Sequence, residues 1–149
     1  MKLHVLHCGY IRVDETVPFG DRVNLRDTAK QLLTPDAGRL TLPVCCYLID
    51  HKRGLVLVDA GLSRELSPDG VYDPKAVAAV FPPQLAALFH PWVPAGMTAA
   101  EQLAAMGIRP EELELIVLTH LDADHVAGLR AMRRAKRLLL PEDEHFWAC

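Results

Sequence analysis

The sequence predicts an α/β layered domain, because short apolar runs typical of strands alternate with segments that carry helix-capping signals. The 149 residues are 50% hydrophobic, 23% charged and 6% aromatic, which is close to the composition of an average globular protein. A chain of this length can bury one hydrophobic core. We therefore expect a single domain over residues 1–149.

Three strands are expected in the first part of the chain. Lys2–Val13 is rich in β-branched and large apolar residues. Leu42–Asp50 and Leu55–Asp59 are two further apolar runs, separated by four residues that include Gly54. This spacing predicts a β-hairpin, and the nearly continuous apolar character of both runs indicates strands covered on both faces.

Two segments of the first hundred residues have less regular patterns. Asp14–Leu40 is long and polar, which is typical of a functional loop, and a short helix is expected around Leu25–Leu33. Phe81–Met97 contains no Lys, Arg, Asp or Glu but includes Phe89 and Trp92. A lid over a substrate, a dimer contact and ordinary core packing are the three interpretations of this stretch, and core packing is favoured.

Two helices in the middle of the chain have start signals. Asp73–Phe81 opens with an N-cap aspartate followed by proline. Thr98 and Glu101 have the spacing of a capping box, which predicts a helix over Ala99–Met106, and Gly107 ends it.

The last third of the chain alternates again between strand and helix. Glu114–Thr119 reads as a short buried strand, and a helix is expected over His125–Met132. A strand at Arg137–Leu140 and a helix opening at Pro141 follow.

Charge and hydropathy exclude several classes of protein. Sixteen basic and 19 acidic residues give a net charge of −3, which argues against a nucleic-acid partner. Residues 76–100 carry no charge, but four prolines interrupt them, so no membrane span is expected. The N-terminal residues lack the pattern of a signal peptide, and we expect a cytoplasmic location. No C-x-x-C spacing occurs, which predicts reduced, mostly buried thiols at Cys8, Cys45, Cys46 and Cys149.

Two histidines and two aspartates lie within six residues, directly after a buried strand and before a helix: His120, Asp122, Asp124 and His125. Imidazole and carboxylate groups together suit Zn²⁺, Mn²⁺ or Fe²⁺. A loop at the end of a buried strand lets residues this close in sequence converge while a rigid scaffold anchors them. In the alternative interpretation, Asp122 or Asp124 caps the following helix and the histidines are surface residues.

Residues 120–125, His-Leu-Asp-Ala-Asp-His, resemble the His-x-His-x-Asp-His signature of the metallo-β-lactamase-fold hydrolases, and Gly128 fits the glycine that follows it. Residues 55–61 resemble the strand of that family that ends in Asp-x-Gly, and residues 107–112 resemble its helix and turn before the motif strand. Leu42-Pro43 and residues 46–50 are similar to the acyl-homoserine-lactone lactonases within that superfamily. The resemblance spans almost the whole chain.

The resemblance implies a metal-dependent hydrolase. It places His120 and Asp122 on one metal ion, and Asp124 and His125 on another, with one or two Zn²⁺ ions as the cofactor and Mn²⁺ or Fe²⁺ as alternatives. A metal-bound hydroxide, oriented by the catalytic Asp124, would attack the carbonyl of a small-molecule lactone or ester. Asp59 is either a partner that orients a ligand histidine or simply a turn former, and the two interpretations are about equal.

Two departures from the family pattern have physical consequences. Asp122 stands where the family has its second histidine, and the added negative charge would weaken the Lewis acidity of the metal or shift its preference toward harder ions. The family fold is an αββα sandwich whose remaining ligands lie in a second half. We therefore expect a truncated chain that forms the N-terminal half, a mixed β-sheet flanked by helices. Its uncovered sheet face would be covered by the missing C-terminal half or, in a homodimer, by a second copy.

Two other functions stay open. A non-catalytic half-domain could persist as an interaction module that binds at most one metal weakly. The same fold could also cleave a thioester, a phosphodiester or a sulfate ester.

Overall fold

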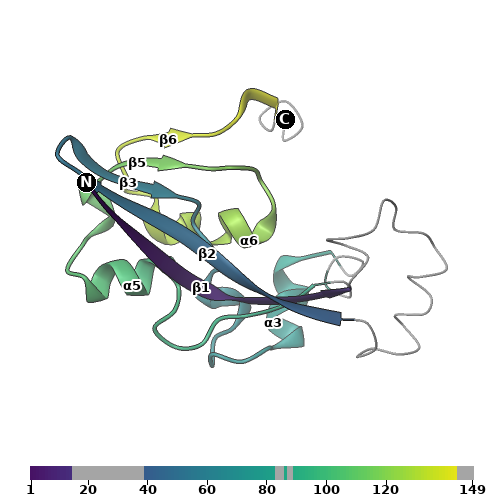
Figure 1. Ribbon diagram of the computed structural model, residues 1–149. Coiled ribbons are helices and arrows are strands. Elements are labelled where there is room, and N and C mark those ends of the chain that lie inside the picture. Colours follow the sequence, from purple (N-terminus) through teal and green to yellow (C-terminus); the bar gives the residue numbers. More distant parts are fainter. Residues whose placement is uncertain (15–38, 83–85, 87–88, 144–149) are drawn as a thin grey trace.

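The computed structural model describes residues 1–14, 39–82, 86 and 89–143 (Figure 1). One mixed sheet has the strand order β4-β1-β2-β3-β5-β6. Its strands are β1 (Lys2–Asp14), β2 (Arg39–His51), β3 (Gly54–Val58), β4 (His90–Trp92), β5 (Leu113–Val117) and β6 (Leu138–Leu139). The α-helices are α3 (Pro74–Val80), α5 (Ala99–Ala105) and α6 (Ala123–Val126), and the 3₁₀-helices are η1 (Arg64–Leu66), η2 (Pro110–Glu112) and η3 (Ala127–Met132).

The antiparallel part of the sheet confirms the strands predicted there. β1 pairs with β2, and Gly54 closes the β2–β3 hairpin with a φ of +131°, a conformation that glycine adopts readily. Asp14 and Arg39, which the sequence places in a loop, pair with each other and extend the two strands. The rest of that loop, with the helix expected around residues 25–33, lies outside the described residues.

Strand β4 is not predicted by the sequence, because three residues that include a proline give no periodic signal. It pairs with β1, where Trp92 lies beside Tyr10. Gly9 lies at a bulge in β1, and a Cβ atom there would come within 2.6 Å of the Trp92 carbonyl oxygen. Phe81 and Phe89 pack against the core, as the core-packing interpretation of this stretch requires.

The helix starts agree with the capping signals. Asp73 accepts hydrogen bonds from two backbone N–H groups at the start of α3, and Thr98 and Glu101 form the expected capping box of α5. The helix predicted over His125–Met132 differs, because it begins at Ala123 as α6 and continues as the 3₁₀-helix η3. β5 and β6 overlap the strands predicted there.

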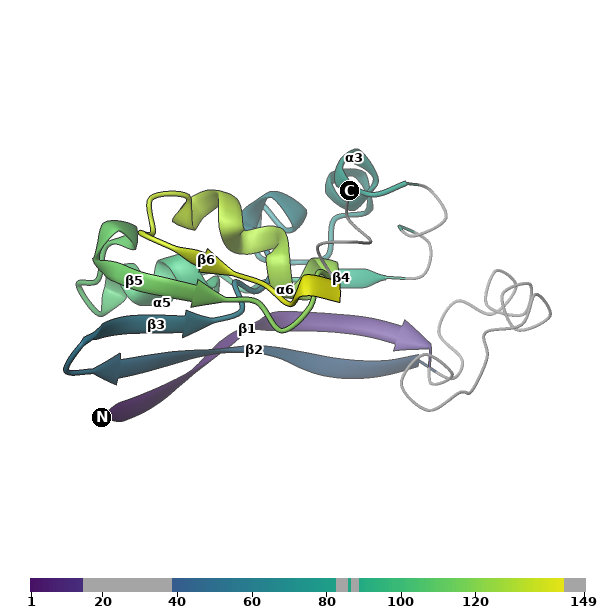
Figure 2. The same ribbon diagram turned by 90° about the horizontal axis from the view of Figure 1, so that it is seen from above.

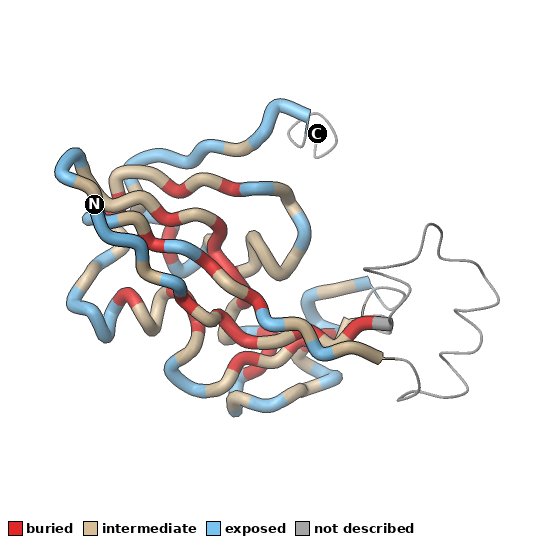
Figure 3. Tube along the Cα trace, viewed as in Figure 1, coloured by how far each residue is buried: buried red, intermediate tan, exposed pale blue. Residues whose placement is uncertain are grey.

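The helices lie on one side of the sheet (Figure 2). Along β1 and β2, buried residues, among them Leu6 and Cys46, alternate with more exposed ones, and the alternation is visible along both strands in Figure 3. The opposite face is apolar as well: Val5 pairs with Tyr47, and Leu3, Val5 and Tyr47 are 61%, 61% and 40% exposed. None of the described helices covers this face.

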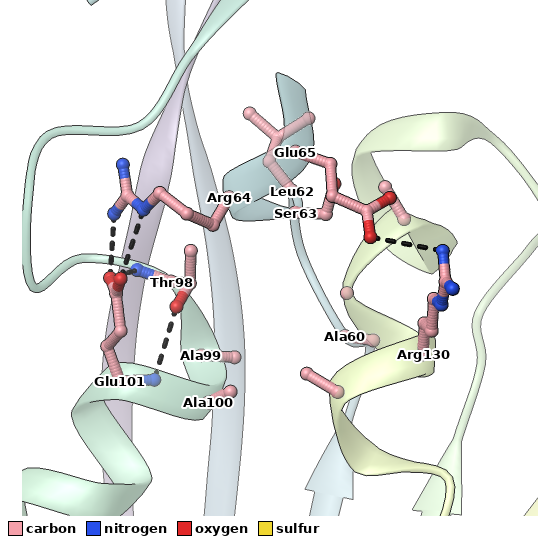
Figure 4. Close-up of a pocket in the computed structure, with 13 residues that line it drawn as sticks. Ala60, Leu62, Ser63, Arg64, Glu65, Thr98, Ala99, Ala100, Glu101 and Arg130 are labelled. Atoms are coloured by element: carbon pink, nitrogen blue, oxygen red, sulfur yellow. Dashed lines mark hydrogen bonds and ion pairs between the residues drawn. The ribbon is translucent and has the colours of Figure 1, made fainter. Parts of the chain in front are cut away.

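Two ion pairs border a cavity of about 410 Å³ on the helical side, between η1, the start of α5 and η3 (Figure 4). Arg64 donates to both carboxylate oxygens of Glu101, at 3.0 and 2.7 Å, and Arg130 donates to Glu65 at 3.1 Å. The hydrogen bonds from Arg64 lower the pKa of Glu101 to about 2. The Arg64–Glu101 pair therefore ties η1 to the start of α5 at neutral pH.

The cysteines within the described ranges are free thiols; Cys8 and Cys46 are fully buried, as predicted, whereas Cys45 is half-buried and Cys149 lies outside the described residues. In the part of the chain that the structure describes, no helix has the length and apolar character needed to cross a membrane. The cytoplasmic location stays a prediction. The helix expected from Pro141 lies mostly outside the described residues.

Candidate metal centre

The four motif side chains gather where the chain leaves β5 and enters α6. His120 and Asp122 lie in the connecting loop, whereas Asp124 and His125 lie in α6. The ring centroids of the two histidines are 3.9 Å apart. The loop therefore brings the two imidazole groups together, as the sequence predicts.

Each histidine faces one aspartate through its Nε2 atom. His120 Nε2 lies 3.4 Å from Asp122 Oδ2, and His125 Nε2 lies 3.4 Å from Asp124 Oδ2. Charge-assisted N–H···O bonds are about 2.7–2.9 Å long, so both contacts are long for hydrogen bonds. Two ligands on one tetrahedral zinc ion, each bound at about 2.1 Å, lie about 3.4 Å apart. Both separations therefore fit two ligands that share a cation.

Each pair is only part of a metal site. Within the described ranges, no group of three or more His, Cys, Asp or Glu side chains is arranged to hold a metal ion. Zinc sites in enzymes use about three protein ligands. The structure thus brings His120 close to Asp122 and His125 close to Asp124, two candidate ligands in each pair, and their binding of a metal ion stays a prediction.

The capping alternative fails for Asp122. Asp122 occupies the N-cap position of α6, yet its side chain makes no capping hydrogen bond and is 79% exposed. Asp124 lies in the first turn of α6, where a carboxylate is favourable, but its side chain is only 20% exposed and is turned toward His125.

Asp59 follows β3 directly and is 3% exposed. Its Oδ2 atom lies 2.8 Å from His125 Nδ1, which is the contact required of a residue that orients a histidine. Its Oδ1 atom accepts a hydrogen bond from the backbone N–H of Thr119 at 2.8 Å. The Thr119 hydroxyl lies 2.9 Å from Asp59 Oδ2.

The backbone at Asp59 adopts a φ of +60°, which is uncommon for a residue other than glycine. Such conformations cost about 1–3 kcal/mol and persist where the surroundings determine them. Here the Asp59 N–H donates to the Val117 carbonyl in β5, and the Ala60 N–H donates to the His125 carbonyl in α6, both at 2.8 Å. The turn is thus held by the elements on both sides of the motif.

Gly128 brings η3 against the same turn. Its N–H donates to the Gly61 carbonyl at 2.8 Å, and a Cβ atom on Gly128 would lie 2.1 Å from the Ala60 carbonyl oxygen. No side chain fits there, which gives a physical reason for the glycine after the motif.

A cavity of about 430 Å³ opens beside Asp122 and Asp124. Apart from these two carboxylates, the residues that line it are apolar, including Phe81, Phe89 and Ala123. Its walls come from segments far apart in the sequence, so sequence patterns did not reveal the cavity.

Sequence reasoning also missed Thr119, whose hydroxyl lies between Asp59 and His120. Its position immediately before His120 was the available signal. An uncharged residue type does not by itself point to metal chemistry.

Comparison with known protein families identifies the superfamily of this chain. The family model described as "Metallo-beta-lactamase superfamily" matches residues 39–140. The chain belongs to this superfamily. The superfamily assignment confirms the resemblance read from the motif and from the strand that ends at Asp59.

Two relatives within the superfamily carry a named activity. The chain is 31% identical over 145 residues to the N-acyl homoserine lactonase AiiB of Agrobacterium fabrum, covering 96% of this chain and 48% of the relative. It is 30% identical over 117 residues to the N-acyl homoserine lactonase of Bacillus cereus, covering 75% and 42% respectively. The chain spans about half the length of the curated relatives it matches.

Solved structures share the fold. An N-acyl homoserine lactone hydrolase with N-hexanoyl-L-homoserine bound at its catalytic metal centre matches with a TM-score of 0.74 and 21% identity, over 99% of this chain and 51% of that one. The dizinc quorum-quenching lactonase AidC matches with a TM-score of 0.56 and 17% identity, over 97% and 43%. The mixed sheet with helices is therefore the expected part of the superfamily fold.

The contact of Gly128 with the Asp59 turn generates a prediction. Gly128→Ala lowers the free energy of unfolding by about 3 kcal/mol or more, because the added methyl group meets a backbone oxygen that cannot move freely. Gly107→Ala is the control, because Gly107 has a φ of +76° but open space around it, so this variant strains the backbone without a steric clash. That variant costs about 1 kcal/mol. Urea unfolding measures both, and equal losses would contradict the close packing of η3.

Proposed function

We propose that this chain carries the metal-binding motif of a metal-dependent hydrolase that opens lactones or cleaves related esters. The observation that carries the proposal is the pair of His–Asp contacts at 3.4 Å on a loop tied to Asp59. The lactonase names of the relatives support the substrate class, as does the N-hexanoyl-L-homoserine bound in a structural neighbour.

His120 and Asp122 would hold one metal ion, and Asp124 and His125 a second. Zn²⁺ is the proposed cofactor, with one or two ions, and the dizinc neighbour supports it. The carboxylate of Asp122 makes Mn²⁺ or Fe²⁺ alternatives, because hard oxygen ligands favour harder ions. When bound, such an ion polarises a substrate carbonyl and makes water a nucleophile near neutral pH.

The surrounding residues supply the remaining functions. The carboxylate of Asp124 lines the cavity and would orient the attacking water. The apolar walls of the same cavity, which include Phe81 and Phe89, suit the hydrocarbon part of a lactone or ester. Asp59 would keep His125 in its binding orientation through the 2.8 Å contact with Nδ1.

The lining of the cavity also bears on the alternative reactions. Among the described residues that line it there is no Lys, Arg or His, whereas Asp122 and Asp124 contribute negative charge. A phosphodiester or sulfate ester would therefore depend on the bound metal ions to balance its negative charge. The apolar lining suits the hydrocarbon part of a lactone, ester or thioester, and the phosphodiester and sulfate ester alternatives stay open.

The test compares zinc content and hydrolysis of an N-acyl homoserine lactone by the full-length gene product and its variants. His120→Ala and His125→Ala each lower zinc affinity and kcat/KM by about 100-fold or more, because each removes half of a ligand pair. His51→Ala is the control, because His51 is the last residue of β2, at the turn of the β2–β3 hairpin, and it leaves both quantities unchanged.

Unchanged hydrolysis in both motif variants would contradict the proposal. A monomeric, metal-free 149-residue product with a well-ordered fold would instead support the non-catalytic half-domain.

We further infer that the uncovered sheet face packs against a second sheet, which the C-terminal half of the longer superfamily sandwich would supply. Leu3, Val5 and Tyr47 form neighbouring rows on this face, so a continuous apolar surface is left to water. The relatives have about as much chain again outside the matched half, which is the length a second layer needs. A homodimer is the competing arrangement.

The 149-residue chain alone is expected to bind a hydrophobic dye and to self-associate without a defined stoichiometry. Val5→Lys with Tyr47→Lys removes both properties, whereas Val71→Lys, at a loop residue of equal exposure to Val5, does not. Sedimentation and dye fluorescence measure the outcome. A well-defined dimer abolished by the double variant would favour the homodimer, and a dye-free monomer would contradict an interface on this face.

A further inference from the structure

The hydroxyl of Thr119 lies between two side chains that the sequence separates by 61 residues. Thr119 Oγ1 is 2.9 Å from Asp59 Oδ2 and 3.1 Å from Asp59 Oδ1. It is also 2.9 Å from His120 Nδ1. The neighbouring backbone N–H of Thr119 donates to Asp59 Oδ1, which fixes where the threonine side chain begins.

The directions of these hydrogen bonds follow from the available protons. A threonine hydroxyl has one proton and two lone pairs, whereas a carboxylate only accepts. The hydroxyl proton must therefore go to Asp59, which leaves Oγ1 to accept from His120 Nδ1. His120 then carries its proton on Nδ1, and its Nε2 atom has a free lone pair.

His125 reaches the same state without a relay. Its Nδ1 atom is 2.8 Å from Asp59 Oδ2, so it donates to that carboxylate and leaves its own Nε2 without a proton. In both histidines the Nε2 atom then faces an aspartate oxygen at 3.4 Å. In the neutral imidazole, each pair consists of a lone pair opposite a carboxylate, which a metal cation held between them would stabilise.

We propose that Thr119 is a positioning residue whose hydroxyl relays the Asp59 carboxylate to His120, so that one buried carboxylate sets the metal-binding tautomer of both motif histidines. This inference rests on the proposed function in taking the two Nε2 atoms as metal ligands. It adds Thr119 to the site and explains which ring nitrogen of each histidine is left to bind the metal, because a neutral imidazole binds a cation only through the nitrogen that lacks a proton.

The burial of Asp59 makes the relay effective. At 3% exposure the carboxylate has little access to water, so its hydrogen bonds to Thr119 and His125 are not readily exchanged for solvent. The His120 side chain is 36% exposed, and without the relay water would compete for its Nδ1 atom.

The experiment assigns the tautomers of both histidines in the metal-free full-length gene product from long-range ¹⁵N–¹H NMR correlations, at a pH where the imidazoles are neutral. Thr119→Val removes the hydroxyl at nearly constant volume, and Thr119→Ser keeps it. Thr41→Val, at an exposed threonine of β2, is the matched control. Titration calorimetry with Zn²⁺ gives the affinity of each variant.

In the wild-type chain both histidines are expected to carry the proton on Nδ1. Thr119→Val moves His120 to a mixture of tautomers, leaves His125 unchanged and weakens Zn²⁺ binding by about 10–100-fold, whereas Thr119→Ser and Thr41→Val match the wild type. A merely structural role would change both histidines or neither.

A wild-type His120 with its proton on Nε2 would overturn the relay, and this result does not depend on whether the valine variant folds. A serine variant that loses Zn²⁺ affinity as the valine variant does would overturn it as well. Absence of Zn²⁺ binding by the wild type, with both Nδ1 protons in place, would contradict the proposed function and leave the relay standing.

Discussion

The buried carboxylate of Asp59 is the interaction on which the candidate site depends. It is 3% exposed and has three hydrogen-bonding partners: the backbone N–H and hydroxyl of Thr119, and the ring of His125. A carboxylate removed from water is costly unless such partners surround it. These partners are parts of the motif segment, so satisfying Asp59 also fixes the end of β5 and the start of α6.

The mixed topology of the sheet explains why these distant residues meet. β3 and β5 are parallel, and Val58 pairs with Val117. Parallel neighbours end at the same edge of a sheet, so the residues that follow them, Asp59 and Thr119, lie side by side. Helices α3 and α5 belong to the long connection that a parallel pair requires. The position of the motif is therefore a consequence of the fold.

Much of this arrangement is accessible from the sequence because it depends on local signals. The apolar runs predict β1, β2, β3 and β5, and the Thr98–Glu101 spacing predicts α5. The motif spacing and the resemblance identify the four candidate ligands. The resemblance suggests that Asp59 orients a ligand histidine, but only the structure identifies it as His125, because nothing local connects residues 66 positions apart.

The features that the sequence does not predict all depend on contacts between distant segments. β4 is a strand only because it pairs with β1 at Trp92, and the helix after the motif tightens into η3 where Gly128 meets the Asp59 turn. The residues that line the apolar cavity come from several segments far apart in the sequence. The role proposed for Thr119 depends on the contact of its hydroxyl with Asp59, which follows the neighbouring strand, and the residue type alone does not reveal that contact.

Asp59→Asn tests the central claim most directly, because the substitution keeps the shape of the side chain but replaces one acceptor oxygen with an NH₂ donor. Zn²⁺ titration calorimetry on the full-length gene product should show affinity about 10–100-fold weaker than in the wild type. Asp50→Asn, at an exposed aspartate of β2, should show no change. Equal Zn²⁺ affinity in the two variants would contradict the conclusion that Asp59 organises the site.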